Sequence, residues 1–201
     1  MAKRLFDIIF SLAGLVVLGP LMVVIAVLVK LDSTGPVFYR GVRSGQHGRL
    51  FRILKFRTMR PDAEKVGGPT TAKRDPRITR IGTVLRRTKL DEIPQVLNVL
   101  AGQMSLVGPR PEVPECTALY VGEEKLILNV RPGVTDFASI EFLHLDDLVG
   151  DETPYEVYMQ RVWPVKNALR IRYVKEQSLL LDVKLICATF TRLFSSGRGI
   201  R

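Results

Sequence analysis

Apolar residues run almost without interruption from Ile8 to Val29. At about 1.5 Å per residue, this stretch can span roughly 30 Å of hydrocarbon. It is too long for the apolar region of a signal peptide, and charged residues rather than a small-residue cleavage site follow it. We therefore expect a retained membrane helix within residues 1–32, and a separate domain over residues 33–201.

Two features of this segment bear on whether it crosses the bilayer. Gly19-Pro20 lies near its middle, and proline removes a backbone hydrogen bond and kinks a helix. Basic residues flank both ends, with Lys3 and Arg4 before the segment and Lys30 and several arginines after it. A crossing would place one basic set outside the cytoplasm, whereas a helix broken in the middle could enter and leave by the same face. A kinked spanning helix is the alternative, because spanning helices tolerate proline.

The rest of the chain alternates β-rich runs with helical spacing. Residues 36–59 hold two β-rich runs separated by glycines, which predicts a hairpin, and the polar, proline-containing residues 60–80 predict a long loop. Helical spacing recurs at 81–104, 115–129, 154–174 and 179–194, and residues 134–150 mix short strands with an acidic loop. The predicted fold class is α+β and mostly helical.

The helix predicted at 179–194 is amphipathic. Leu180 and Val183 lie on its apolar stripe, and Lys184 and Arg192 add positive charge. Such a helix could lie in a membrane interface. A core helix with solvated charges explains the pattern equally well, so both interpretations stay open.

Composition narrows the class of partner. The formal net charge is +10, which indicates an anionic partner such as a membrane face, a phosphorylated substrate or nucleic acid. Aromatic residues make up only 7% of the chain, so a stacking surface for single-stranded nucleic acid is poorly supplied. The two cysteines lie far apart, and neither belongs to a zinc-binding pattern.

Asp91 and Glu92 are the strongest catalytic candidates. Neighbours on a helix do not face each other, so we expect separate roles rather than a shared proton. Basic residues around them are expected to keep Asp91 ionised, and an ionised carboxylate can attack phosphorus or bind Mg²⁺. The spacing Thr88-x-x-Asp91 before an apolar run also matches a helix capping box, and on spacing alone this structural role is the favoured interpretation.

Basic residues occur in two clusters along the sequence, one around Lys55 and one around Arg86. Guanidinium groups suit diphosphate oxygens, but most of these cations are expected to form a solvated face that attracts anionic lipid. Arg110 is the best candidate for a dedicated phosphate ligand, because a proline on each side fixes its backbone. The sequence contains no Walker A loop and no Rossmann glycine fingerprint.

Several short motifs, taken in order, resemble those of the bacterial sugar transferase family, the small monotopic phosphoglycosyl transferases. The motifs are Lys3-Arg4-Leu5-Phe6-Asp7, Gly35-Pro36-Val37-Phe38-Tyr39, Lys55-Phe56-Arg57-Thr58-Met59, Leu85 to Gln95, Asn98-Val99-Leu100, Met104 to Pro111, Arg131-Pro132-Gly133-Val134-Thr135 and Asp182-Val183-Lys184. Each motif is weak alone, but their order along nearly the whole chain makes the resemblance specific.

This resemblance implies a re-entrant membrane helix-break-helix, broken at Gly19-Pro20, and a cytoplasmic catalytic domain with a short hairpin and interfacial amphipathic helices. The location would be the bacterial inner membrane, with membrane phospholipids as partners. It further implies that Asp91 attacks the sugar-bearing phosphate of a UDP-sugar and releases UMP. Polyprenyl (undecaprenyl) phosphate would then take the sugar phosphate from the aspartyl intermediate, in a ping-pong sequence.

The resemblance also assigns the remaining site residues. Glu92 would be the catalytic partner of Asp91, and Mg²⁺ the cofactor, with Asp91 as its ligand. The implied role of Asp91 replaces the capping role that spacing favours. The substrate-binding candidates are Lys55, Arg86, Arg110 and Arg131.

The sequence departs from the family pattern at two places. Gly19-Pro20 stands where the family often has Ser-Pro, and Asp136 follows Thr135 where the family usually has glycine. The second departure lies in a region that shapes sugar choice, so the sugar stays open, as do the pathway and a homodimer. A non-catalytic basic adaptor at the membrane surface is the alternative function, and nucleic-acid binding is not expected.

Overall fold

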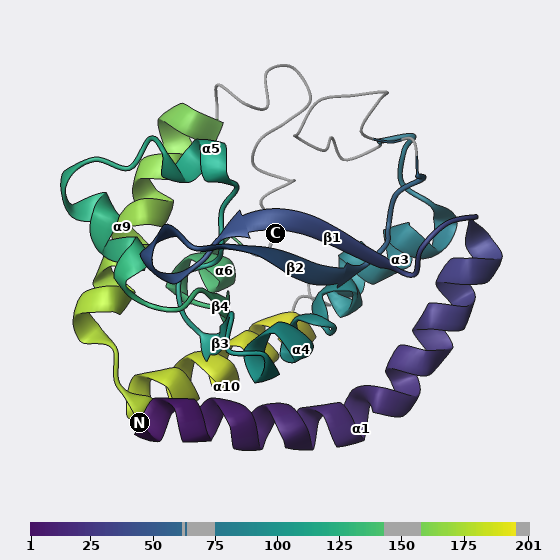
Figure 1. Cartoon of the computed structure of the whole chain (residues 1–201), viewed down its shortest axis with the longest axis horizontal. Helices are drawn as coiled ribbons and strands as arrows, with labels where there is room; N and C mark the ends of the chain where they lie inside the picture. Colours follow the sequence, from purple (N-terminus) through teal and green to yellow (C-terminus); the bar gives the residue numbers. More distant parts are fainter. Residues whose placement is uncertain (62, 64–74, 143–157, 196–201) are drawn as a thin grey trace.

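The computed structural model describes residues 1–61, 63, 75–142 and 158–195, and in these ranges the chain is mostly helical with two small β-sheets (Figure 1). The elements in chain order are α1 Ala2–Asp32, β1 Phe38–Ser44, η1 Gln46–Gly48, β2 Leu50–Phe56, α3 Arg80–Thr88, η2 Leu90–Glu92, α4 Gln95–Leu100, β3 Ser105–Val107, α5 Pro114–Thr117, η3 Gly122–Asn129, β4 Gly133–Thr135, α6 Phe137–Glu141, η4 Tyr158–Val162, α9 Trp163–Glu176 and α10 Leu179–Ser195. The predicted fold class is confirmed at this level. Most of the loop predicted at 60–80, and part of the acidic loop at 134–150, lie outside the described residues.

The N-terminal segment forms one helix, α1, that continues through Pro20. Figure 1 shows that this helix bends part-way along its length, whereas a helix-break-helix was predicted. The physical reason is that proline removes one backbone donor while the rest of the helical hydrogen bonds survive. Gly19 has open space around the position of a Cβ, so no neighbouring element forces the backbone at this point.

The predicted hairpin is present and forms a core with α1. Strands β1 and β2 pair antiparallel, with Phe38 opposite Phe56, and the two rings stack with centroids 5.4 Å apart. Phe56 packs against Ile25 and Val29 of α1 and Leu85 of α3. Helix α1 is therefore part of the hydrophobic core of the domain.

A second, smaller sheet is formed by residues later in the sequence. Strands β3 and β4 pair in parallel, and Val107 of β3 lies opposite Thr135 of β4. The backbones of Gly108 and Gly133 approach so closely that a Cβ on Gly133 would overlap the amide nitrogen of Gly108. Only glycine fits at this crossing.

The structure corrects two predicted helices and the capping box. The helix predicted at 81–104 is divided, because Lys89 adopts a left-handed backbone that ends α3 and a tight 3-10 turn follows. The helix predicted at 115–129 is wrong in most of its length: η3 is a series of 3-10 turns that begins at Gly122, whose φ is positive. Thr88 is not an N-cap, because its hydroxyl donates to carbonyl oxygens of the preceding turn of α3.

Candidate active site

Asp91 and Glu92 lie in the 3-10 turn η2, where the chain passes from α3 to α4. The left-handed Lys89 before the turn and Pro94 after it keep this segment from joining either helix. Asp91 is buried, with 6% of its surface exposed. Its carboxylate accepts no hydrogen bond from the residues that the structure describes, so it stays available for a ligand.

Glu92, in contrast, is paired with two cations from distant parts of the chain, Lys55 and Arg110. We call these three residues the Glu92 clamp. Lys55 Nζ, at the end of β2, lies 2.8 Å from Glu92 Oε1. Arg110 binds the same carboxylate through both terminal nitrogens. Its Nη1 lies 2.9 Å from Glu92 Oε2, and its Nη2 donates to Glu92 Oε1. The two neighbouring carboxylates thus have different environments.

The same difference appears in the acidities of these groups. Burial raises the pKa of Asp91 above its ordinary value, although Lys55, Arg110 and Lys89 oppose this shift. Burial alone would also raise the pKa of Glu92, but Arg110 and Lys55 together hold it well below its usual range. The sequence led us to expect that neighbouring cations would favour the ionised form of Asp91, but burial outweighs them there, whereas at Glu92 the cations outweigh burial.

The two cations of the clamp shift in opposite directions. Burial lowers the pKa of Lys55, and Arg110 adds to this effect, while Glu92 and Asp91 oppose it. The pKa of Arg110 is raised, mainly by Glu92. Asp91 and Glu92 thus have pKa values shifted in opposite directions, and two cations lie beside them. In such a site one carboxylate can attack, while the other holds the cations that stabilise developing charge.

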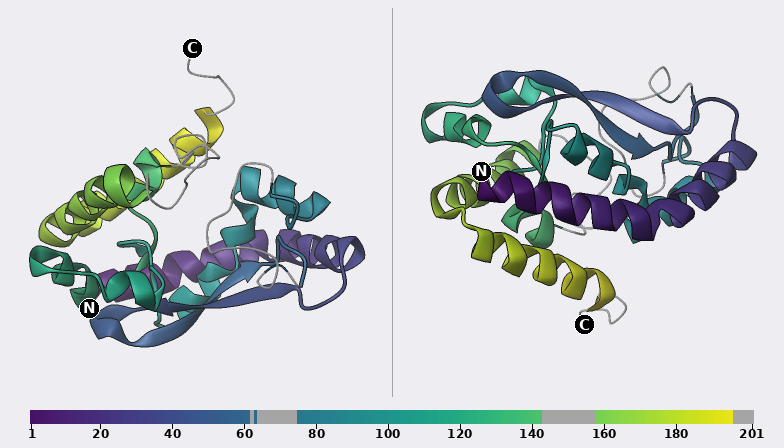
Figure 2. Two further views of the ribbon diagram at one scale, coloured as in Figure 1. Left: turned by 90° about the horizontal axis from the view of Figure 1, so that it is seen from above. Right: turned by 60° about the horizontal axis from the view of Figure 1, so that its bottom comes forward.

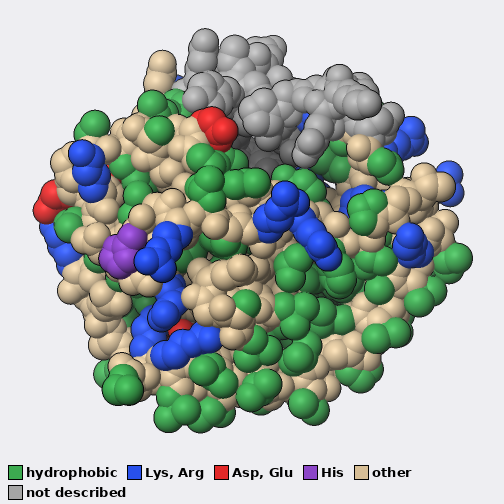
Figure 3. Space-filling model, in the orientation of Figure 1, with side chains coloured by type: hydrophobic (Ala, Val, Ile, Leu, Met, Phe, Trp, Pro, Cys, Tyr) green, Lys and Arg blue, Asp and Glu red, His purple; other side chains and the backbone are tan. Residues whose placement is uncertain are grey.

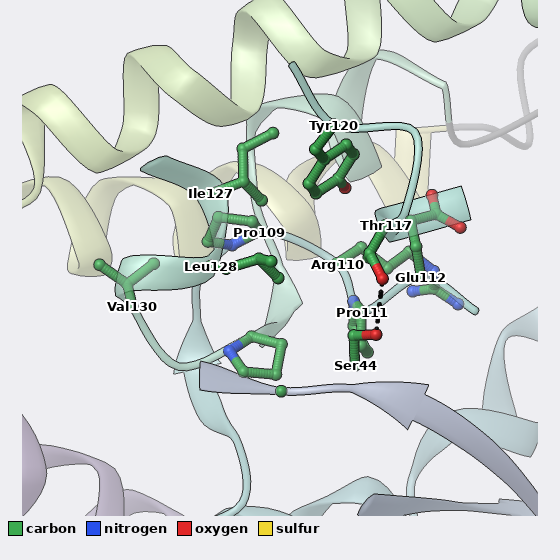
Figure 4. A pocket seen from close by; sticks show the side chains of 12 residues that line it. Ser44, Pro109, Arg110, Pro111, Glu112, Thr117, Tyr120, Ile127, Leu128 and Val130 are labelled. Carbon is green, nitrogen blue, oxygen red and sulfur yellow. Dashed lines mark hydrogen bonds between the residues drawn. The ribbon is translucent and has the colours of Figure 1, made fainter. Parts of the chain in front are cut away.

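Hydrogen bonds involving backbone atoms hold the loop that carries Arg110 at two points. Arg110 N donates to Asp136 Oδ2 at 3.2 Å, and Gly133 N donates to Pro109 O at 3.0 Å. Figure 4 shows the pocket behind this loop, where Ser44 and Thr117 join their hydroxyls 2.7 Å apart. The surrounding prolines and hydrophobic side chains make this pocket mostly apolar. The residues around it pack next to the Arg110 loop.

A second buried charge cluster, which the sequence did not indicate, continues from this loop. Glu112 Oε1 lies 2.5 Å from Arg170 NH2 and 3.4 Å from Lys166 Nζ, both on α9. Burial would raise the pKa of Glu112, but these two cations lower it to about 2. Burial lowers the pKa of Lys166 to about 8. The cluster ties the segment after Arg110 to α9.

The other predicted site residues lie apart from the clamp or make different contacts. Arg86 Nε donates to Thr58 Oγ1 at 3.2 Å. Arg131 is exposed and donates from Nε to Gly102 O at 3.0 Å, just beyond the C-terminal end of α4. The structure thus brings Lys55, Asp91, Glu92 and Arg110 together, and gives Arg86 and Arg131 separate partners.

Among the residues that the structure describes, Asp91 is the candidate ligand for a divalent cation. No group of three or more His, Cys, Asp or Glu side chains suited to a metal ion gathers within the described ranges. Glu92 is already occupied by cations, but Asp91 can supply one carboxylate oxygen. Mg²⁺ in phosphoryl-transfer sites is commonly held by one or two carboxylates together with substrate phosphates and water, so the site fits that mode.

An apolar surface runs along α1 on the outside of the molecule. This is the one helix in the described ranges that is long and apolar enough to cross a membrane. The most exposed of its large hydrophobic residues include Leu5, Val16, Val17, Val23 and Leu31. Hydrophobic side chains gather along the lower margin of the molecule in Figure 3, where Figure 1 places this helix. A soluble protein rarely exposes such a surface, so an apolar partner is indicated.

These features occur in a chain whose sequence matches a known protein family over nearly its whole length. The family model described as bacterial sugar transferase matches residues 1–196. The chain belongs to the bacterial sugar transferase family. The resemblance noted from the motifs is confirmed, and the chain is an enzyme of this class.

Three similar proteins illustrate the range of the family. The transferase is 39% identical to the exopolysaccharide production protein PSS of Rhizobium leguminosarum bv. phaseoli, over 98% of this chain and 97% of that protein. It is 40% identical to the UDP-glucose:undecaprenyl-phosphate glucose-1-phosphate transferase of Xanthomonas campestris pv. campestris, over 96% of this chain but 38% of that protein. It is 36% identical to the UDP-N-acetylgalactosamine-undecaprenyl-phosphate N-acetylgalactosaminephosphotransferase of Aeromonas hydrophila, over 99% of this chain and 45% of that protein.

Proposed function

We propose that the transferase moves a sugar-1-phosphate from a UDP-sugar to polyprenyl phosphate by a ping-pong reaction through Asp91. One observation carries this proposal: two adjacent carboxylates lie in one turn, and only Glu92 is paired with cations while Asp91 is left without a hydrogen-bond donor among the described residues. The names of the relatives, which act on undecaprenyl phosphate with glucose or N-acetylgalactosamine donors, support the substrate class.

In the first step, an oxygen of Asp91 attacks the phosphorus that bears the sugar. The bond from this phosphorus to the bridging oxygen of UMP breaks, and UMP leaves with the bonding electron pair. In the second step, a phosphate oxygen of polyprenyl phosphate attacks the same phosphorus, and the Asp91 carboxylate is released. Burial removes water from the nucleophile, which protects the acyl phosphate from hydrolysis between the two steps.

The Glu92 clamp supplies charge stabilisation without becoming a nucleophile. Lys55 and Arg110 are fixed by Glu92 before substrate arrives, so little reorganisation is needed when negative charge develops on the transferred group. Glu92 is the catalytic partner in this sense, since it orients both cations. We include Mg²⁺ in the proposal, with Asp91 as its protein ligand, and the ion would neutralise charge on the donor diphosphate.

We also propose that α1 enters and leaves the bilayer by the cytoplasmic face. Near its N-terminus, Lys3 Nζ donates to Val107 O, and Arg4 donates to the carbonyl oxygens of Val99 and Leu100. At its other end, Arg57 NH2 donates to Ser33 O at 2.7 Å. A straight helix of 31 residues would separate its ends by about 45 Å. Because both ends bind the same domain, a bent, re-entrant path fits better than a crossing.

Cysteine labelling tests this path. In a Cys116→Ser, Cys187→Ser chain, Ala2→Cys and Thr34→Cys are each expected to react with a membrane-impermeant maleimide in inverted vesicles, and not in spheroplasts. Val16→Cys is the matched control, because the bilayer would cover this exposed position and prevent labelling. Labelling of either end from the outer side would contradict a re-entrant helix.

The pKa shifts predict a displaced pH profile. Asp91 must be ionised to attack, and its raised pKa places the acid limb of kcat/KM at a higher pH than an ordinary aspartate would give. Lys55 must be protonated to hold Glu92, and its lowered pKa places the alkaline limb below that of an ordinary lysine. Initial rates of UMP release across pH measure both limbs.

The variant Lys55→Arg tests the assignment of the alkaline limb. It is expected to move only this limb to higher pH, since arginine stays protonated. An alkaline limb at the same pH would refute the assignment to Lys55.

The donor assay tests the proposed function directly. The purified protein, in nanodiscs of anionic phospholipid, is incubated with a panel of UDP-sugars, and UMP is measured with and without polyprenyl phosphate. We expect one UMP per enzyme with donor alone, and continuous release when the acceptor is present. A non-catalytic adaptor would release no UMP with any donor.

A further inference from the structure

Helix α10 begins beside the N-terminal end of α1, as Figures 1 and 2 show from several directions. Asp182, in the first turn of α10, is fully buried, and its Oδ2 lies 2.5 Å from Lys3 Nζ of α1. Its other oxygen, Oδ1, lies 2.7 Å from the hydroxyl of Tyr173, a fully buried residue of α9. One carboxylate therefore joins three helices.

The two partners of Asp182, Lys3 and Tyr173, both contact one backbone atom, the carbonyl oxygen of Val107. Lys3 Nζ donates to this oxygen at 3.0 Å, and the Tyr173 hydroxyl lies 3.0 Å from it. The hydroxyl has a single proton, so it can serve Asp182 or Val107, while the ammonium group of Lys3 has enough protons for both. Val107 is the last residue of β3 and stands three positions before Arg110.

The backbone between Val107 and Arg110 has little freedom once Val107 is fixed. Gly108 N donates to Thr135 O at 2.9 Å, and Arg110 N is held by Asp136. The hydroxyl of Thr135 lies 2.7 Å from that of Thr189, so α10 contacts this small sheet a second time. A shift of α10 or of the N-terminus of α1 would therefore reach Arg110 through a short, fully bonded path.

We propose that Asp182 is a positioning residue for phosphosugar transfer: by holding Lys3 and Tyr173 on the Val107 carbonyl, it sets the Arg110 loop so that the guanidinium meets Glu92. This inference rests on the proposed function, since it assigns Arg110 its role in the reaction. Asp182 is fully buried, so in this role it acts through Arg110 rather than by touching substrate. Displacement of catalytic groups by about 1 Å can cost on the order of 100-fold in rate, so a small slackening of this loop is sufficient for a large effect.

A double-mutant cycle separates positioning from simple stabilisation. Asp182→Asn keeps the shape of the side chain but removes the charge that holds Lys3, and is expected to lower kcat about 10- to 100-fold with KM for the donor little changed. Arg110→Lys keeps a positive charge but loses the two-nitrogen grip on Glu92, and so lowers activity by itself. In the Arg110→Lys background, Asp182→Asn is expected to lower kcat less than about threefold, because the group that it positions is already lost.

Two further variants keep this test decisive. Ser178→Ala is the matched control, since the Ser178 hydroxyl accepts from Leu181 N at the start of α10 but is not in contact with Val107. It should weaken the helix start without changing kcat. If Asp182→Asn fails to fold, Tyr173→Phe removes one hydroxyl and keeps the ring, and should show the same pattern with Arg110→Lys.

The outcomes distinguish the inference from the proposed function. Equal loss of kcat from Asp182→Asn in both backgrounds, or no loss in the parent chain, overturns the positioning role and leaves the proposed reaction intact. Unchanged turnover in Arg110→Lys would instead contradict the role of Arg110 in that reaction. A fall in kcat for Ser178→Ala as large as that for Asp182→Asn would show that any weakening of α10 suffices, which also overturns the positioning role.

Discussion

Asp91→Asn is expected to lower UMP release by at least about 10⁴-fold, because the amide cannot form an acyl phosphate and no second route exists in a ping-pong reaction. With radiolabelled donor alone, the parent enzyme should give one acid-stable labelled adduct per chain and the variant none. The measurement is acid quench followed by gel filtration under denaturing conditions. Substantial adduct in the variant would exclude Asp91 as the nucleophile.

The same substitution is expected not to destabilise the fold. The raised pKa of Asp91 means that its ionised form is less favourable in the folded chain than in the unfolded chain, so at neutral pH this charge costs stability. Asparagine removes the charge and keeps the shape. The midpoint of thermal unfolding should therefore stay the same or rise, which separates loss of chemistry from loss of structure.

Glu92→Gln is expected to give the second largest effect and a different signature. The amide keeps the size of Glu92 but no longer neutralises Lys55 and Arg110, so both cations lose their fixed positions. We expect kcat to fall about 10²- to 10³-fold, as when a stabilising group of an active site is removed. Because Asp91 is intact, the labelled adduct should still form, but slowly, and rapid-quench kinetics measure its rate.

Glu92→Gln is also expected to change stability, in the opposite direction to Asp91→Asn. The pKa of Glu92 lies well below its usual range, so its charged form contributes to folding at neutral pH, and this contribution is lost as pH falls through that lowered pKa. The unfolding midpoint of Glu92→Gln should therefore drop at neutral pH. A variant that lost all adduct without loss of stability would mean that Glu92, rather than Asp91, carries the attack.

Much of the architecture was readable in the sequence because it depends on local patterns. The apolar run from Ile8 to Val29 predicted one long helix, and β-rich runs separated by glycines predicted a hairpin, and both are present. The motifs around Asp91, Glu92 and Arg110 identified the family, which the comparison over residues 1–196 confirms. These are properties of composition, spacing and order.

The division of the helix predicted at 81–104 could not be predicted from its own sequence. The pattern at 81–104 is helical throughout, yet the chain turns at Lys89, a residue type that seldom adopts a left-handed backbone. Hydrogen bonds of Asn98 to the edge of β2 help to hold α4 in its own position. These contacts come from a segment far away in the sequence, and the turn that separates α3 from α4 carries the two carboxylates.

The chemistry of the site was decided by tertiary structure alone. Sequence placed Asp91 and Glu92 side by side with the same local cations, but Glu92 is reached by Lys55 from 37 positions away and by Arg110 from 18 positions away. Which carboxylate is paired, and which is buried without a partner, follows from how β2 and the β3–α5 loop meet around one turn. Acidity depends on burial and on charges in space, so no pattern along the chain could have separated the two neighbours.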